Sequence, residues 1–251
     1  MITLIALLGQ IAAPIAEKLE IKVDGVERSA IVYRASKPSG KVSPIVFVFH
    51  GFTGNAAQAA FSYPVHKEWP QATVVYPQGL QVELLGRKAP GWQIAPNMAG
   101  DRDVKFFDAL VRDLKRADPN KPKQLFTCGM SNGAIFSYVL LTERSSDLAA
   151  AAPVAGYAAP AFRRAKAKPI LIVHGKTDPL IPLSMAEASL NQARKNNQTQ
   201  ETGKEWQPGY TIFAGKSGND VIWHEHPGGH TWPNDVTGAI VKFFQSVVAK
   251  S

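Results

Sequence analysis

The sequence predicts an α/β fold in which a mostly parallel central sheet is covered by helices on both faces. Short apolar runs rich in β-branched residues recur along the 251 residues, and segments with helical spacing stand between them. The runs at 44–49 (PIVFVF) and 169–173 (PILIV) are apolar throughout, which is typical of parallel strands buried on both faces. Because 45% of the residues are hydrophobic, a chain of this length can bury one sizeable core. We therefore expect a single domain over residues 17–251.

The first expected elements form an antiparallel hairpin. Residues 19–23 and 28–34 alternate apolar and polar side chains on either side of an Asp24-Gly25 turn. A buried strand at 44–49, a helix at 56–62 and a strand at 72–76 follow. Residues 77–100 contain several prolines and glycines without a clean period, so we expect a long loop or a small insertion there.

The second half of the chain continues to alternate helices and strands. Apolar residues from Val104 to Leu114 recur at spacings of three and four, which indicates an amphipathic helix, and Asp101 and Asp103 at its start favour the helix dipole. The remaining expected elements are a strand from 124, a helix to 142, strands at 149–154 and 169–173, a helix at 183–196, strands at 210–213 and 220–224, and a closing helix at 235–248. Residues 197–209 show no regular pattern.

Residues 129–133, Gly-Met-Ser-Asn-Gly, join the strand from 124 to its helix. This is the layout of a nucleophile elbow, in which a serine stands on a tight, strained turn. Glycines flank the serine because side chains there would collide with the strand and the helix. The alternative is an ordinary Gly/Ser turn, since a bare G-x-S-x-G also arises by chance.

A serine hydroxyl becomes a good nucleophile only when a base takes its proton and a third group orients that base. Asp178 follows the buried strand at 169–173, and His230 lies in a glycine-rich loop between the last strand and the closing helix. The order serine, acid, histidine, each after a strand, is that of the α/β-hydrolase fold. We therefore predict a triad of Ser131, Asp178 and His230, with Asp235 as the second choice for the acid.

Acyl transfer also requires backbone N–H donors for the developing oxyanion. The residue after the serine, Asn132, and Phe52 in the loop after strand 44–49 are the expected donors, with Thr53 as a further candidate. Glycines at 51 and 54 would let that loop come close to the serine.

A metal site is the main alternative use of the histidines. His224 and His226 lie two residues apart on an expected strand, so they share a face, and His230 follows. A catalytic zinc would compete with the triad for His230, and no further ligand is evident, so we expect no metal. The single cysteine, Cys128, excludes an intrachain disulfide and is expected to be a buried apolar residue.

The formal net charge of +8 is spread along the chain. A nucleic-acid groove would need a concentrated basic stripe with aromatic residues, so we expect no nucleic-acid partner. A solvated basic face is the simplest interpretation, and attraction to acidic partners such as uronic-acid-bearing polysaccharide is the alternative.

The apolar run at 2–16 has the length of a signal peptide and is too short to span a bilayer. We predict a signal peptide at 1–16 and a secreted or periplasmic protein, with cleavage between Ala13 and Lys18. The absence of Lys or Arg before Lys18 weakens this prediction. The alternatives are a start site placed too late or an apolar N-terminal element.

Seven motifs together resemble the feruloyl esterase and polyhydroxybutyrate depolymerase family of α/β-hydrolases, over residues 20–248. They are His50-Gly51 with Gly54-Asn55-Ala56, Val75-Tyr76-Pro77-Gln78-Gly79, Gly91-Trp92-Gln93, Asp103-Val104, Gly129-Met130-Ser131-Asn132-Gly133-Ala134, His174-Gly175 with Asp178-Pro179, and Gly229-His230-Thr231-Trp232-Pro233. The resemblance implies an exported serine esterase without a cofactor, with Ser131, Asp178 and His230 as nucleophile, acid and base. Many members carry cysteines in the His-Gly loop, where this chain has Phe52 and Thr53, so no disulfide is carried over.

By this resemblance we expect a carboxylic ester hydrolase that acts on feruloyl or acetyl esters of plant polysaccharide. A hydroxybutyrate depolymerase or oligomer hydrolase, a serine peptidase and a non-catalytic carbohydrate-binding domain are the alternatives. Thr53, Trp92, Gln93 and Trp232 are the candidate substrate contacts, and core packing is the alternative role for each. We expect no membrane association and no obligate protein partner.

Overall fold

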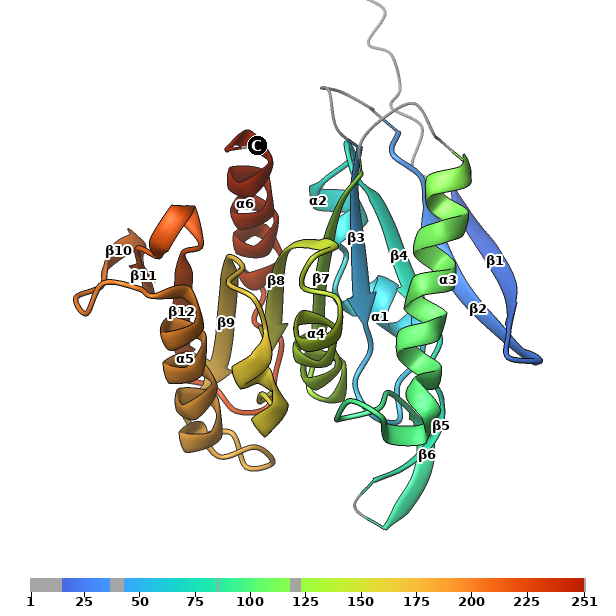
Figure 1. Cartoon of the computed structure of the whole chain (residues 1–251), viewed down its shortest axis with the longest axis horizontal. Coiled ribbons are helices and arrows are strands. Elements are labelled where there is room, and N and C mark those ends of the chain that lie inside the picture. Colours follow the sequence, from blue (N-terminus) through green and yellow to red (C-terminus); the bar gives the residue numbers. More distant parts are fainter. Residues whose placement is uncertain (1–14, 37–42, 85, 118–122, 251) are drawn as a thin grey trace, which may run out of the picture.

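The computed structural model describes residues 15–36, 43–84, 86–117 and 123–250 (Figure 1). A ten-stranded sheet crosses this part of the chain in the order β1-β2-β4-β3-β7-β8-β9-β12-β11-β10. Its strands are β1 (Ala16–Val23), β2 (Val26–Tyr33), β3 (Ser43–Phe49), β4 (Thr73–Pro77), β7 (Lys123–Met130), β8 (Leu148–Val154), β9 (Ile170–Gly175), β10 (Lys204–Gln207), β11 (Tyr210–Phe213) and β12 (Val221–His226). A separate hairpin consists of β5 (Leu80–Leu84) and β6 (Arg87–Gly91).

The centre of the sheet is parallel and its two margins are antiparallel. Strands β4, β3, β7, β8, β9 and β12 pair in parallel, while β1-β2-β4 and β12-β11-β10 pair antiparallel. The first hairpin turns at Asp24 and Gly25, whose φ angles of 48° and 82° suit the tight two-residue turn between Val23 and Val26. The mostly parallel sheet and the opening hairpin predicted from the sequence are therefore confirmed.

Helices cover both faces of the sheet (Figure 1). The helices are α1 (Ala56–Ser62), α2 (Val65–Glu68), α3 (Arg102–Ala117), α4 (Asn132–Glu143), α5 (Leu183–Asn197) and α6 (Val236–Ala249), with 3₁₀ turns at Met98–Asp101, Pro160–Arg164 and Lys216–Gly218. In β3, Ile45, Phe47 and Phe49 pack with α3 and α4 in one core layer. The alternate residues Val46 and Val48 pack with α1 and α6 in the other. This alternation explains why the central strands are apolar without interruption.

Two segments without a predicted element contain strands. The β5–β6 hairpin occupies much of 77–100, and β10 lies within 197–209. Both lack a run of buried residues: β6 buries only Ala89 and Gly91, and β10 is exposed or half-buried throughout. Backbone pairing creates these strands, and pairing leaves no hydrophobic period in the sequence.

Cys128 is fully buried in β7, as predicted, and burial raises the pKa of its thiol.

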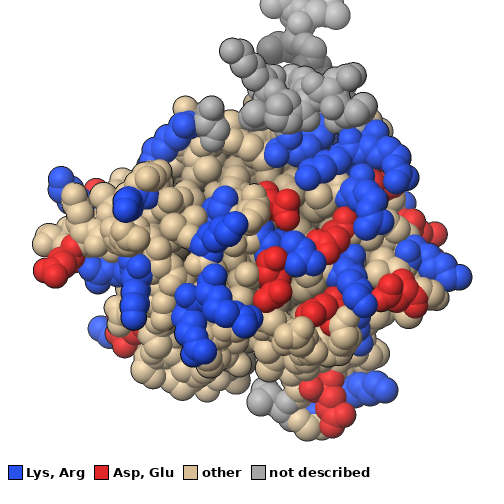
Figure 2. All heavy atoms as spheres, viewed as in Figure 1, with Lys and Arg blue, Asp and Glu red and all other residues tan. Residues whose placement is uncertain are grey.

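Most of the predicted signal segment lies outside the described residues, and Ala16 already belongs to β1. Within the described ranges, every helix is too short or too polar to cross a bilayer. Figure 2 shows Lys and Arg scattered over one face with Asp and Glu among them, rather than gathered into a stripe.

Two glycine-to-alanine substitutions in helices test the close approach of α4 to β3. A Cβ at Gly133 would collide with the Phe49 carbonyl and would lie 2.7 Å from the His50 carbonyl oxygen. A Cβ at Gly238, in α6, would meet nothing within 4 Å. We expect Gly133→Ala to lower the free energy of unfolding by about 2 to 3 kcal/mol. Gly238→Ala should leave it unchanged or raise it by up to about 1 kcal/mol. Urea denaturation measures both, and equal effects would contradict this packing.

Candidate active site

Ser131 stands at the turn between β7 and α4 with φ 57° and ψ −119°. Such a backbone is strained for a residue other than glycine, by about 1 to 3 kcal/mol. Hydrogen bonds hold the turn: the Ser131 N–H donates to the carbonyl of Val154 at 2.9 Å, and the Ile135 N–H donates to the Ser131 carbonyl at 3.0 Å. Gly129 and Gly133 pack so closely against the end of β3 that a Cβ on either would collide with the Phe49 carbonyl. The predicted elbow is thus present, with the serine at its apex.

Asp178 and His230 form a hydrogen-bonded pair. The Nδ1 atom of His230 lies 2.7 Å from Oδ2 of Asp178. Because an ionised carboxylate only accepts hydrogen bonds, Nδ1 carries the proton and donates it to this contact. The Nε2 atom of His230 is therefore left unprotonated in the neutral ring, as a general base requires.

The loop after β9 keeps the Asp178 carboxylate ionised. Oδ1 accepts the backbone N–H groups of Leu180 at 2.8 Å and Ile181 at 2.9 Å, and the side chain is fully buried. Burial by itself would raise the pKa of Asp178. The hydrogen bonds from Ile181, His230 and Leu180 outweigh it, so that the pKa lies below its ordinary value. The carboxylate is charged at neutral pH and orients the imidazole.

The sheet brings the acid and base loops together. Strands β9 and β12 are parallel neighbours, so the loops that follow them leave the same edge. The N–H of Lys176 donates to the carbonyl of His226 at 2.8 Å, and that of Thr177 donates to Gly228 at 3.1 Å. Ser131 follows β7 at the same edge, two strands from β9. The hydrogen-bond partner of His230 in this structure is Asp178, and the contact between a catalytic base and its serine often tightens only when substrate binds.

The loop after β3 lies against Ser131. A Cβ at Gly51 would lie 3.5 Å from Cβ of Ser131. His50 anchors this loop, because its Nε2 accepts the N–H of Gly79 at 3.0 Å and its Nδ1 donates to the carbonyl of Gly51 at 2.7 Å. Burial lowers the pKa of His50, so this ring is neutral and acts as a structural bridge.

The structure distinguishes among the three predicted oxyanion donors. The N–H of Thr53 donates to the carbonyl of Pro90 at 2.9 Å, so it is not free to bind an oxyanion. Thr53 also has a φ of 71°, and its side chain is exposed. Asn132 is the first residue of α4, whose initial N–H groups have no partner within the helix. Asn132 and Phe52 thus remain the candidate donors.

Two of the predicted substrate contacts are wrong. The side chain of Trp92 is fully buried: its indole stacks on Phe136 with ring centroids 5.4 Å apart, and its Nε1 donates to the His50 carbonyl at 2.9 Å. Gln93 is also fully buried, and its side-chain amide bonds to Asp101 at 2.8 Å. Neither side chain can touch a substrate in this conformation.

Trp232 is half-buried beside the base loop. Its ring stacks on Tyr63 with centroids 4.3 Å apart, and its Nε1 donates to Oγ1 of Thr237 at 2.9 Å. The hydroxyl of Tyr63 donates to Sδ of Met130, the residue before Ser131. The indole is thus held in one orientation near the elbow, and part of it remains exposed.

The histidines of β12 have other partners. Nδ1 of His224 contacts the carbonyl of Gly209 at 2.7 Å, Nδ1 of His226 accepts the N–H of Gly228 at 3.1 Å, and His230 is bound to Asp178. Across the described ranges, no three His, Cys, Asp or Glu side chains converge into a metal-ligand group.

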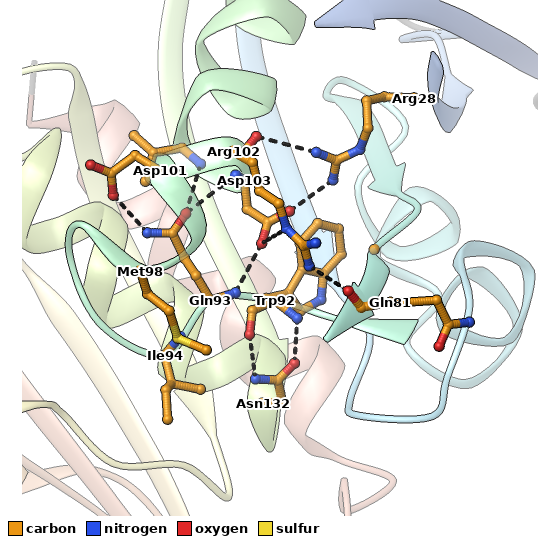
Figure 3. Close-up of polar contacts among 12 residues, drawn as sticks. Arg28, Gln81, Trp92, Gln93, Ile94, Met98, Asp101, Arg102, Asp103 and Asn132 are labelled. Carbon is orange, nitrogen blue, oxygen red and sulfur yellow. Dashed lines mark hydrogen bonds and ion pairs between the residues drawn. The ribbon is translucent and has the colours of Figure 1, made fainter. Parts of the chain in front are cut away.

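The sequence interpretation missed a buried ion pair behind the site (Figure 3). Arg28 of β2 donates to Oδ1 of Asp103 at 2.9 Å, and the Asp103 side chain is fully buried. Its other oxygen accepts the N–H of Gln93 at 2.9 Å. From the sequence, Asp103 is expected only to favour the helix dipole. The signal for the ion pair is Arg28, a charged residue at an inward-facing position of the alternating strand β2, which requires a buried partner of opposite charge.

The proteins to which this chain is similar include esterases. No family model matches the chain. In sequence it is similar to the bifunctional acetylxylan esterase/xylanase XynS20E of Neocallimastix patriciarum, 26% identical over 175 residues, which are 68% of this chain and 24% of the relative. The chain therefore spans about a quarter of that relative's length.

Two solved structures share its architecture. One is an acetyl xylan esterase from Aspergillus awamori, with a TM-score of 0.69 and 14% identity over 90% of this chain and 99% of that one. The other is a Bacillus cereus carboxylesterase, with a TM-score of 0.61 and 16% identity over 88% and 94% of the two chains. These likenesses confirm the predicted α/β-hydrolase fold.

Asp178→Asn tests the electrostatics of the acid loop. Because hydrogen bonds lower the folded pKa of Asp178, its ionised form adds stability that is fully present above about pH 4. This stability is lost as the pH falls through the folded pKa. Wild type should exceed Asp178→Asn in urea midpoint near pH 6, and the difference should shrink near pH 3. A difference that stays constant over this range would contradict the assignment.

Proposed function

We propose that this protein is a serine esterase that hydrolyses carboxylic esters through an acyl-enzyme on Ser131. The 2.7 Å contact between Nδ1 of His230 and Oδ2 of Asp178 carries the proposal, because it leaves Nε2 free as a base. The strained turn that presents Ser131 at the same sheet edge supplies the nucleophile. The similarity to XynS20E and to solved esterases supports the same reaction class.

In the proposed mechanism, Nε2 of His230 takes the hydroxyl proton as Oγ of Ser131 attacks the ester carbonyl. The imidazolium that forms is stabilised by the buried Asp178 carboxylate. The backbone N–H groups of Phe52 and Asn132 receive the oxyanion, and the N-terminus of α4 adds a favourable dipole. His230 then protonates the leaving alcohol, and the same residues activate a water molecule that hydrolyses the acyl-enzyme.

For the substrate we favour an acetyl or feruloyl ester of plant polysaccharide. The name of the relative XynS20E and that of the Aspergillus awamori enzyme both specify acetylxylan esterase. The sequence also resembles feruloyl esterases in motifs such as residues 229–233, and this resemblance is the reason to include an aromatic, feruloyl acyl group among the proposed substrates. A hydroxybutyrate oligomer is the second candidate, because this family resemblance also covers polyhydroxybutyrate depolymerases and both reactions use the same triad. We also propose export, from the apolar run at 2–16.

Ser131→Ala tests the mechanism. We expect kcat for p-nitrophenyl acetate to fall by about 10⁶-fold, because the nucleophile is lost. The control variant Ser146→Ala, at an exposed position, should retain full activity. An organophosphonate should label Ser131 alone, as read by mass spectrometry of peptides. Retained activity in Ser131→Ala, or labelling of another residue, would refute the mechanism.

Parallel assays on an amide and on intact sugar esters decide between an esterase, a peptidase and a non-catalytic binding domain.

A three-substrate panel tests the substrate class. Methyl ferulate, acetylated xylan and a soluble hydroxybutyrate oligomer are compared by kcat/KM with the wild-type enzyme. We expect turnover of one or both of the first two to exceed that of the oligomer. Release from the oligomer alone would reject the polysaccharide-ester proposal and leave the esterase mechanism standing.

Trp232 is the proposed aromatic contact for a substrate ring, in place of Trp92. Its half-exposed indole is already oriented by Tyr63 and Thr237, so little order is lost when a ring stacks on it. We expect Trp232→Leu to lower kcat/KM for methyl ferulate by about 1 kcal/mol, or roughly fivefold, and to leave p-nitrophenyl acetate nearly unaffected. Equal losses on both esters would instead assign the residue a packing role.

A further inference from the structure

The β5–β6 hairpin and the two residues after it contact both candidate oxyanion donors. On one side, the carbonyl of Pro90 accepts the N–H of Thr53, next to Phe52. On the other, Trp92 is bonded to the side chain of Asn132. Gly91 passes between them, because a Cβ there would lie 2.8 Å from Oδ1 of Asn132 and 3.1 Å from the ring of Phe52. One short segment of backbone thus lies between the side chains of Phe52 and Asn132, whose N–H groups are the candidate donors.

The side chain of Asn132 makes a two-point contact with that segment. Its Oδ1 accepts the N–H of Trp92 at 2.7 Å, and its Nδ2 donates to the carbonyl of Trp92 at 3.0 Å (Figure 3). Asn132 is buried, with 3% of its surface exposed. The side chain therefore does not face a substrate. It links the first residue of α4 to the backbone of Trp92.

The segment is held from behind by Asp103, at the start of α3. The N–H of Gln93 donates to Oδ2 of Asp103 at 2.9 Å, and the N–H of Asp103 donates back to Oε1 of Gln93 at 3.2 Å. Arg28 neutralises the carboxylate through Oδ1 at 2.9 Å. A buried charge pair adds little net stability, although breaking it is costly. Its geometry, by contrast, fixes the position of Gln93.

We propose that the side chain of Asn132 and the carboxylate of Asp103 are positioning residues for the oxyanion hole. They hold residues 91–93 from opposite sides, and those residues set the distance between the N–H groups of Phe52 and Asn132. The proposal rests on the proposed esterase function. An oxyanion hole stabilises the transition state only when both donors lie within about 2.7 to 3.1 Å of the oxyanion. Displacing one donor weakens binding of the transition state much more than binding of the substrate.

Two variants test the proposal against a matched control. Asn132→Ala keeps the backbone N–H and removes both contacts to Trp92. Asp103→Asn removes the charge that holds Gln93 and Arg28. Asp108→Asn is the control, because Asp108 lies on the same helix and pairs with Arg144 at 2.7 and 2.8 Å without contacting the hairpin. Each variant is measured for kcat and KM on p-nitrophenyl acetate, for affinity toward an alkyl boronic acid that mimics the tetrahedral intermediate, and for thermal stability.

We expect kcat to fall by about 100-fold in Asn132→Ala and about 10-fold in Asp103→Asn, with KM within about threefold of wild type. Boronic acid affinity should fall by similar factors. Asp108→Asn should lose stability but keep kcat and boronic acid affinity. If Asp103→Asn does not fold, Asn132→Ala decides alone.

Losses of kcat no larger than in Asp108→Asn, or an effect on KM alone, would overturn the proposal. Failure of this inference is separate from failure of the esterase mechanism. Phosphonate labelling of Ser131 and the inactivity of Ser131→Ala test that mechanism without reference to residues 91–93. A labelled Ser131 together with full activity in Asn132→Ala would therefore reject the positioning role alone.

Discussion

The backbone of Ser131 is the constraint on which the site depends. Its positive φ can persist only if the surrounding structure holds the turn against a strain of about 1 to 3 kcal/mol. Helix α4 supplies this support, because it is buried along the length from Asn132 to Leu141. The same turn brings α4 against the carbonyl of Phe49, at the end of β3. The loop that carries Phe52 therefore begins beside Ser131, and the elbow and the candidate oxyanion loop depend on the same close packing of α4 on β3.

The site contains one buried carboxylate, Asp178, and a second, Asp103, lies behind it. The two are held in different electrostatic surroundings. Among the described residues, the ion-pair partners of Asp178 are the histidines His174 and His230 rather than a Lys or Arg. Asp178 is held ionised by two backbone N–H groups and by the imidazole that it orients. Asp103 faces the guanidinium of Arg28, which is itself buried and stacked on the ring of Phe106. In the proposed mechanism, the first arrangement leaves a charge that stabilises the transient imidazolium of His230. The second is neutralised by Arg28 and holds the backbone N–H of Gln93.

Much of the fold and the candidate triad could be predicted because both leave strong signals in sequence. Strands such as β3 and β9 are buried on both faces and are apolar throughout. The order of Ser131, Asp178 and His230 after three strands follows from the topology of the fold. The β5–β6 hairpin and β10 could not be predicted, because their stability comes from backbone pairing at exposed positions. Trp92 was misassigned because a motif gives a residue's place in the chain, whereas side-chain direction depends on packing.

In the proposed mechanism, the burial of Trp92 places the residues that set the rate apart from those that contact the substrate's variable groups. The hairpin end is bonded through backbone groups to both sides of the candidate oxyanion hole, so under the proposed mechanism changes there would act on the transition state of every ester alike. The loops after β9 and β12, by contrast, carry exposed or half-buried apolar side chains beside the candidate triad. Leu180, two residues after the acid, is 70% exposed, and Trp232, two residues after the base, is half-buried. An ester's acyl and alcohol groups can differ in their contacts with these loops without disturbing the triad, because the carboxylate and imidazole are fixed by backbone and side-chain bonds of their own.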